Sequence, residues 1–158
     1  MNVQTFRVQG ATWRIVFPTE GLKVLEDHRQ LRKGSSEAVG QLFSADLTGE
    51  DVMIDLVTVL PPTRASSHGV VFSPESAKIE RERLFANGLH FVGLWHSHPQ
   101  KHPSPSSTDL RLAAEHARAA LHNLTGILFV IVGTDAFPKG LFVGVHDGSR
   151  LHGARFEY

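Results

Sequence analysis

The segment from Trp95 to Asp109, WHSHPQKHPSPSSTD, concentrates groups that can bind a metal ion: three of the chain's ten histidines and one carboxylate. Side chains alternate between the faces of a strand, so His96 and His98 are expected to point to the same side. Asp109 follows in the first turn of a predicted helix, where unpaired backbone N–H groups favour a carboxylate. Two imidazoles and one carboxylate suit zinc and leave a fourth position for water, as a catalytic zinc site requires.

Each part of this pattern also has an ordinary structural explanation. A chain with ten histidines contains roughly one His-x-His pair by chance. Ser106-x-x-Asp109 is a common helix-capping pattern, although Ser107 is the better candidate for a plain cap. The complete pattern adds a proline, a serine and an aspartate at fixed distances, and its chance expectation is on the order of 10⁻⁴ per chain. The combination therefore predicts a metal site of His96, His98 and Asp109.

The full spacing resembles the His-x-His-Pro-x6-Ser-x-x-Asp signature of the JAMM (MPN+) zinc metalloproteases. It stands here, without departure, as His96, His98, Pro99, Ser106 and Asp109. The order of the expected elements over nearly the whole chain also agrees with that family. The resemblance implies a zinc-dependent hydrolase with a single JAMM/MPN domain over residues 1–158.

The family also has a glutamate far upstream, on a strand that follows the first helix. The stretch SSEAVGQLFS is similar to that element and makes Glu37 the matching residue. A carboxylate beside an activated water can take its proton and pass it to a leaving amine, and the resemblance gives Glu37 this role. It gives Ser106 the role of hydroxyl donor to the oxyanion. Without the resemblance, Glu37 is a solvated glutamate and Ser106 a helix cap.

The remaining histidines form no second convincing metal set. His116 and His122 are six residues apart on one predicted helix, which is a poor spacing for a single ion. His102 lies near the site and is either an orienting or substrate-contacting group or a polar loop residue. Trp95 alternates away from the metal face and is expected in the core, while Leu94 is expected on the ligand face.

Composition excludes several classes of protein. Sixteen basic residues balance sixteen acidic ones, so net charge gives no support for nucleic-acid binding. The absence of cysteine excludes disulfides and thiolate metal sites. The apolar runs are too short to span a bilayer, and the start of the chain lacks the apolar core of a secretory signal. A cytoplasmic protein without membrane contact is expected.

Hydrophobic periodicity and breaker residues predict mixed strands and helices. The predicted strands lie in residues 6–17 around Gly10, 37–47 and 52–60 as a hairpin, 70–72, 89–95, 126–133, and 140–158 as a hairpin with a turn at Asp147-Gly148. The predicted helices are 18–32 with Thr19 as cap, 73–88 with Ser73 as cap, and 106–124, and residues 61–69 read as a loop. This order predicts an α/β (α+β) fold with a mixed central sheet flanked by helices. The resemblance implies the MPN/JAB, cytidine-deaminase-like version of it.

The resemblance also implies a substrate class. Family members with a complete site cleave isopeptide or peptide bonds after the tail of ubiquitin or a ubiquitin-like protein. Compact bacterial members, which this chain is similar to, do so beside E1- and E2-like operon partners, including in anti-phage defence. The segments 61–72 and 133–140 are candidate walls of the site, and their shortness predicts little selectivity among polyubiquitin linkages. Two alternative functions are open. One is a metallopeptidase with the same site, which releases a residue such as cysteine from a sulfur-carrier protein. The other is a non-catalytic MPN scaffold.

Overall fold

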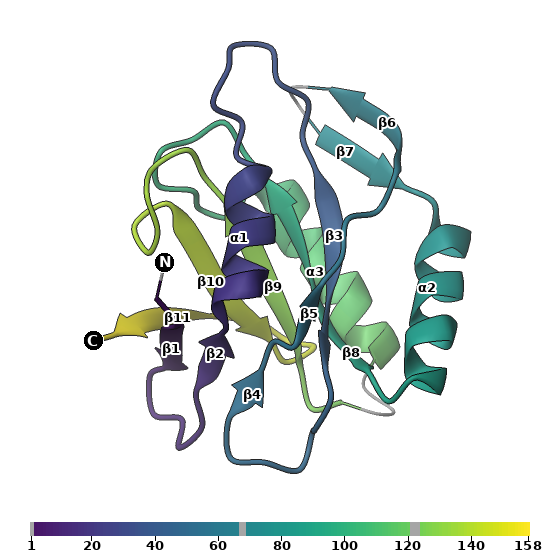
Figure 1. The fold of residues 1–158 in the computed structure, drawn as a ribbon, viewed down its shortest axis with the longest axis vertical. Coiled ribbons are helices and arrows are strands. Elements are labelled where there is room, and N and C mark those ends of the chain that lie inside the picture. The colour runs from purple at the N-terminus through teal and green to yellow at the C-terminus, as the bar shows by residue number, and fades with distance from the viewer. Residues whose placement is uncertain (1, 67–68, 121–123) are drawn as a thin grey trace.

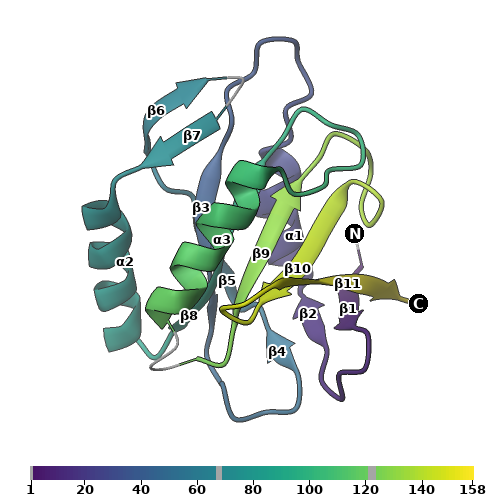
Figure 2. The ribbon, with the colours of Figure 1, turned by 180° about the vertical axis from the view of Figure 1, so that it is seen from behind.

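The computed structural model describes residues 2–66, 69–120 and 124–158. These residues form a nine-stranded sheet, three helices and a separate two-stranded hairpin. Helix α1 (Thr19–Asp27) lies over the face of the sheet seen in Figure 1, and α3 (Ser107–Ala120) lies over the opposite face, seen in Figure 2. Helix α2 (Pro74–Ala86) packs beside β8 (His90–Ser97). The predicted mixed sheet flanked by helices is confirmed.

The other strands are β1 (Gln4–Val8), β2 (Ile15–Phe17), β3 (Val39–Ser44), β4 (Val52–Met53), β5 (Leu56–Val57), β6 (Pro62–Ser66), β7 (Gly69–Phe72), β9 (Ile127–Val132), β10 (Leu141–His146) and β11 (Leu151–Glu157). Their order in the large sheet is β4-β2-β1-β11-β10-β9-β8-β3-β5. Strands β8 and β9 are parallel, whereas β3 pairs with β8 in the antiparallel direction. Strand β8 is therefore an inner strand, and the segments on both sides of it can reach groups at its carboxyl end.

Two apolar clusters hold α1 and α3 on the sheet. On one face, Leu22 and Leu25 of α1 pack in a cluster that includes Trp95 and Val130. On the other face, Leu94 packs with Phe129 and Ala113 of α3. Strands β3 and β9 are buried at every position because both faces of the sheet are covered there. The predicted core position of Trp95, which is fully buried, is confirmed.

Gly40 lets β3 and the indole of Trp95 approach closely. A Cβ atom built on Gly40 would lie 1.8 Å from the Thr58 carbonyl oxygen and 2.3 Å from the indole nitrogen. That nitrogen donates a 2.7 Å hydrogen bond to the same carbonyl. A side chain at position 40 would therefore collide with the Thr58 backbone and the Trp95 ring and would displace them.

Helix α1 is shorter than the sequence predicts. It ends at Asp27, not Arg32, and it begins at Thr19, with Pro18 as N-cap and no capping hydrogen bond from a side chain. Leu31, which was expected to continue the apolar stripe of Leu22 and Leu25, is 60% exposed. The apolar stripe thus stops with the helix, and the chain then turns so that Gln30 is buried instead.

Two further predictions about strands are wrong in part. Residues 62–66, predicted as loop, form β6 and pair with β7, because Pro62 occupies the first position of the strand, where its missing N–H is tolerated. The predicted strand 52–60 is split: β4 joins the far edge of the sheet beside β2, and β5 pairs with β3.

The predicted helix boundaries at α2 are confirmed. The Ser73 hydroxyl accepts a hydrogen bond from the Ser76 N–H, Pro74 is the first helical residue, and Gly88 after the end has a φ of +82°. For α3, predicted over residues 106–124, the described part runs from Ser107 to Ala120, and residues 121–123 lie outside the described residues. None of the helices described is long and apolar enough to cross a membrane.

Candidate metal centre

Three side chains converge at the carboxyl end of β8, where α3 begins. The Nε2 atoms of His96 and His98 lie 3.0 Å apart. One Asp109 carboxylate oxygen lies 3.1 Å from the Nε2 atom of His96, and the other lies 3.5 Å from that of His98. All three side chains are at least four-fifths buried, with exposed fractions of 7%, 16% and 9% for His96, His98 and Asp109. The structure thus brings together the three residues that the sequence suggested as ligands.

These atoms have the spacing that one tetrahedral ion requires. Zinc binds imidazole nitrogen and carboxylate oxygen at about 2.0–2.2 Å, which sets neighbouring ligand atoms about 3.3–3.6 Å apart. The observed separations of 3.0, 3.1 and 3.5 Å fall within a few tenths of an ångström of that range. The two Nε2 atoms, 3.0 Å apart, can share one proton in a hydrogen bond, and when both are unprotonated they can bind one cation. The residues present therefore fit a zinc ion.

The charge states of the cluster also favour metal binding. Burial, together with the neighbouring His96, lowers the pKa of His98, so that its neutral, metal-binding form is the stable one. Burial alone would raise the pKa of Asp109, but hydrogen bonds from His96 and Ser106 outweigh it and lower that pKa to about 2. The cluster thus presents one ionised carboxylate beside a neutral imidazole near neutral pH.

Ser106 and Asp109 cap the start of α3 reciprocally. The Asp109 N–H donates to the Ser106 hydroxyl oxygen at 3.1 Å, and the Ser106 N–H donates to the Asp109 carboxylate at 2.9 Å. Ser106, not Ser107, is therefore the cap, because Ser107 is already the first helical residue. Ser106 as a whole is exposed, and its hydroxyl hydrogen is not used by the capping bond, so the group can also donate to a substrate.

Glu37 lies in the same cavity as the three ligand residues, just before β3. Its position follows from the pairing of β3 with β8, in which Val39 stands opposite His96. Glu37 is 6% exposed, and burial raises its pKa to about 7. A carboxylate with such a pKa can take up and release a proton near neutral pH.

The cavity has a volume of about 400 Å³ and a mixed lining. Apart from the groups already described, its walls include the apolar residues Val39, Phe72, Leu94, Leu112 and Phe129. Leu94 thus lies on the ligand face, as expected. Of the two segments expected as walls, residues 61–72 contribute Phe72, whereas residues 133–140 contribute no lining residue. Thr134 instead donates its N–H to the Gln100 carbonyl and so supports a loop that does line the cavity.

A buried hydrogen-bond chain lies behind the cavity, and the sequence reasoning missed it. Ser97 alternates away from its two histidine neighbours and is fully buried. Its hydroxyl oxygen accepts the Ala38 N–H at 2.8 Å, and the hydroxyl donates to the Gln30 side-chain oxygen at 2.9 Å. The Gln30 amide donates to the Ser35 carbonyl at 3.0 Å. The signal in the sequence was a serine at a core-facing strand position, since a buried hydroxyl requires a partner.

Among the residues that the structure describes, the other histidines do not add to the centre. His102 is exposed and lies 2.8 Å from a carboxylate oxygen of Asp135. His116 stacks on Phe72, and His122 lies outside the described residues. Within residues 2–66, 69–120 and 124–158, His96, His98 and Asp109 are the one group of three or more with metal-binding geometry.

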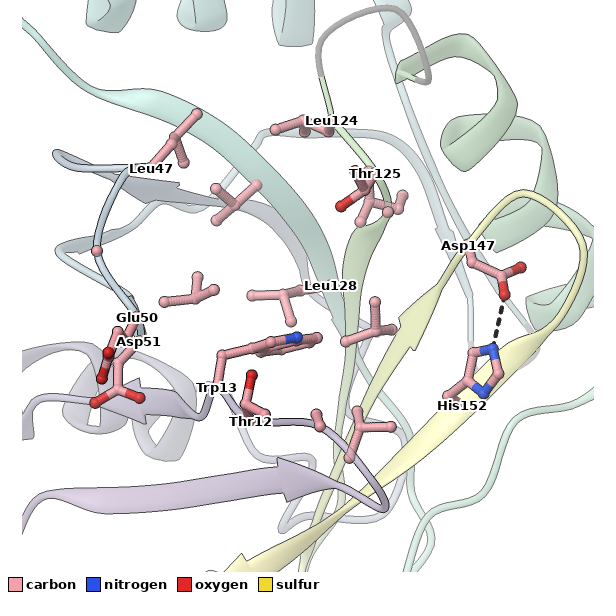
Figure 3. Close-up of a pocket in the computed structure, with 18 of the residues that line it drawn as sticks. Thr12, Trp13, Leu47, Glu50, Asp51, Leu124, Thr125, Leu128, Asp147 and His152 are labelled. Carbon is pink, nitrogen blue, oxygen red and sulfur yellow. Dashed lines mark hydrogen bonds and ion pairs between the residues drawn. The ribbon is translucent and has the colours of Figure 1, made fainter.

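A larger hollow, of about 890 Å³, lies near the opposite end of the sheet, where β8 and β9 begin (Figure 3). The ring of Trp13 lies across it beside Leu128. Asp147 at its edge is paired with His152, as the dashed line in Figure 3 marks, and Asp51 is paired with Arg14. These carboxylates have partners within the chain and do not converge on a common point.

Comparison with known proteins identifies the family of the chain. The family model described as prokaryotic homologs of the JAB domain matches residues 24–142. A Pseudomonas aeruginosa protein named CD-NTase/cGAS isopeptidase is 28% identical over 139 residues, which cover 84% of this chain and 85% of that protein. The solution structure of protein DSY2949 from Desulfitobacterium hafniense has the same fold, with a TM-score of 0.63, 21% identity and 87% of each chain covered. The resemblance to the JAMM/MPN family is confirmed, and the chain belongs to the prokaryotic JAB-domain family.

Proposed function

We propose that the protein is a zinc-dependent isopeptidase or peptidase that cleaves after the C-terminal tail of a ubiquitin-like protein. One observation carries the proposal: two imidazoles and a carboxylate converge in a cavity that also holds the buried carboxyl group of Glu37. Membership of the JAB-domain family supports the reaction class. The name of the Pseudomonas relative, an isopeptidase, supports the type of bond.

His96, His98 and Asp109 would hold the zinc ion through two nitrogen atoms and one oxygen atom. When bound, zinc supplies Lewis-acid chemistry, because it polarises a carbonyl group and makes water acidic near neutral pH. The chain must supply the proton transfers and the orientation of the substrate.

Glu37 is the proposed general base and acid. Its carboxylate accepts a proton from the attacking water as the water oxygen bonds to the scissile carbonyl carbon. The same group then gives that proton to the leaving amine as the C–N bond breaks, so that a carboxyl terminus and a free amine are the products. A pKa raised to about 7 by burial suits both steps, since the two protonation states are then close in free energy.

Ser106 is the proposed donor to the carbonyl oxygen when it becomes negatively charged. Its hydroxyl oxygen is held by the Asp109 N–H, which limits the directions in which the hydroxyl hydrogen can point. A donor fixed in advance stabilises developing charge without reorganisation. Capping and catalysis are therefore compatible roles for this residue.

The proposed substrate is a protein conjugate or precursor with a ubiquitin-like tail. The relative's name includes a CD-NTase, so a nucleotidyltransferase of that class is a candidate for the conjugated protein here. Such a substrate implies E1- and E2-like partner enzymes and a role in anti-phage defence. A cavity of about 400 Å³ that is lined by both apolar and ionisable groups suits an extended chain end.

The test uses the purified chain with two substrates, one with a peptide bond and one with a lysine isopeptide bond after the same ubiquitin-like tail. We expect cleavage to require zinc, to stop on addition of a chelator and to fall about 10²- to 10⁴-fold in Glu37→Gln. The matched control is Glu50→Gln, the same substitution at an exposed glutamate on the edge of the larger hollow. Undiminished cleavage in Glu37→Gln would contradict the assigned base.

The products distinguish the alternative functions. Release of free cysteine from a sulfur-carrier protein, with no cleavage of the longer conjugates, would favour the metallopeptidase that trims a single residue. A chain that binds no zinc after purification, and gains no activity when zinc is added, would be a non-catalytic scaffold.

A further inference from the structure

The hydrogen-bond chain behind the cavity joins the two segments that carry the proposed base and the proposed ligands. The last regular pair between β3 and β8 is Val39 with His96, so Glu37 lies two residues before the paired part of β3. One residue further, the Ser97 N–H donates to the Ala38 carbonyl at 3.0 Å. The Ala38 N–H donates at 2.8 Å to the Ser97 side chain. Both polar groups of the Ala38 backbone are therefore bonded to the residue between the two histidines.

Gln30 extends this connection to the loop that leads into Glu37. Its side-chain oxygen accepts the Ser97 hydroxyl, and its amide nitrogen donates to the Ser35 carbonyl. Gln30 is 5% exposed and Ser97 is fully buried, so water does not compete strongly for these groups. The chain of bonds is continuous from Ser35 through Gln30 and Ser97 to Ala38.

We propose that Gln30 and Ser97 are positioning residues, which fix the Glu37 carboxyl group relative to His96 and His98. This inference rests on the proposed function for its catalytic consequence. Ser97 alternates away from the cavity, so it touches neither a metal ion nor a substrate there. Its effect passes through the Ala38 backbone to the neighbouring Glu37. A displaced base is sufficient to slow proton transfer, since a shift of about 1 Å at a reacting group costs about 10²-fold in rate.

The first variant is Ser97→Ala, which removes the hydroxyl group from a fully buried position. We expect kcat to fall about 10- to 100-fold, as for other groups that orient catalytic residues, with KM and zinc affinity changed less than threefold. Ser97→Thr keeps a hydroxyl and is expected to recover most of the lost kcat. Gln30→Met keeps the side-chain volume without the amide and is expected to lower kcat in the same direction as Ser97→Ala.

The matched control is Ser44→Ala at the other end of β3. Ser44 is also fully buried, and its hydroxyl donates to a backbone carbonyl, that of Asp46. This variant removes the same chemical group from the same strand pair, far from the cavity. We expect it to lower the unfolding temperature slightly, as the loss of a single buried hydrogen bond does, while kcat stays within twofold of the wild type.

A second readout does not depend on catalysis or on metal. Hydrogen exchange of the Ala38 amide, measured by NMR on the folded metal-free protein, is expected to accelerate at least tenfold in Ser97→Ala and to stay slow in Ser44→Ala. An unchanged Ala38 exchange rate would overturn the proposal, as would a kcat within twofold of the wild type. Loss of zinc affinity in proportion to kcat would also overturn it, because the serine would then hold the ligands and not the base. If the wild type cleaves nothing, the proposed function fails, and the exchange rate still decides whether these residues fix the Glu37 segment.

Discussion

The larger hollow and the cavity at the end of β8 differ in where their polar groups find partners. In the hollow of about 890 Å³, Asp51 and Asp147 are satisfied by Arg14 and His152 at its edge. In the cavity of about 400 Å³, the buried His96, His98 and Asp109 face one another. Buried ionisable groups that converge on one point can be bridged by a single ion, whereas groups that are paired separately at a surface cannot. Size alone would select the larger hollow, whereas the convergence of ionisable groups selects the smaller cavity.

Removal of one predicted ligand gives the largest expected contrast. His98→Ala takes away one of three zinc ligands, so we expect loss of stoichiometric zinc binding and of at least 10³-fold in turnover. His152→Ala, at the edge of the larger hollow, is expected to change neither. Metal analysis of both purified variants, combined with a cleavage assay, checks this. Equal zinc content in the two variants would place the metal elsewhere.

The second contrast separates catalysis from helix capping. Ser106→Ala and Ser73→Ala each remove an N-cap hydroxyl, from α3 and α2 respectively, and each is expected to cost about 1 kcal/mol of stability. Only Ser106→Ala is expected to lower kcat, by about 10²-fold, because a donor to the oxyanion is lost. Denaturation curves and steady-state kinetics of both variants give the comparison. Similar kcat values in Ser106→Ala and Ser73→Ala would show that Ser106 caps the helix and has no part in catalysis.

The third prediction concerns the burial of Glu37, whose pKa burial raises to about 7 from an unfolded value of about 4.3. The folded protein binds the Glu37 proton more tightly than the unfolded chain does. Proton binding at Glu37 therefore contributes to the free energy of unfolding fully below about pH 4.3, and this contribution is lost as the pH rises through 7. Glu37→Gln carries no such charge. In chelator-treated protein, we expect the variant to gain about 1–3 kcal/mol over the wild type between pH 4 and pH 8. A difference in unfolding free energy that stays constant with pH would contradict the burial of this group.

The smallest effect on catalysis is expected in the larger hollow. Trp13→Ala removes the ring that crosses it and is expected to lower stability by about 1–3 kcal/mol through lost apolar contacts. Because the described residues that line this hollow include no converging ligands, we expect kcat/KM for the ubiquitin-like substrates to stay within twofold of the wild type. A tenfold loss in this variant, measured below its unfolding temperature, would connect the hollow to substrate binding.

The two halves of the site differ in how well the sequence predicts them. His96 and His98 are close in sequence, and strand alternation places them together. Asp109 follows in the first turn of a helix whose start the serines mark. Glu37 is 59 residues before the first of these histidines, and its approach depends on the pairing of β3 with β8, which local patterns do not specify. Only the resemblance to a family pointed to it.

The errors in the fold have a related cause. The apolar spacing of Leu22, Leu25 and Leu31 predicted a helix to Arg32, but the chain leaves the helix after Asp27 and buries Gln30 against Ser97. A buried hydrogen-bond chain formed by distant segments overrides local helical preference there. Strand β6 was missed for a similar reason, because its pairing with β7 is not visible in the breaker-rich residues 61–69.

The most direct test of the central claim is a zinc titration of chelator-treated protein, followed by cleavage of an isopeptide-linked ubiquitin-like conjugate. In the wild type, we expect the cleavage rate to rise linearly with added zinc and to level off at one zinc ion per chain. In Glu37→Gln, we expect the cleavage rate to stay at background, although the variant binds the same single ion. Cleavage that is independent of zinc, or a Glu37→Gln variant that is as active as the wild type, would contradict the account.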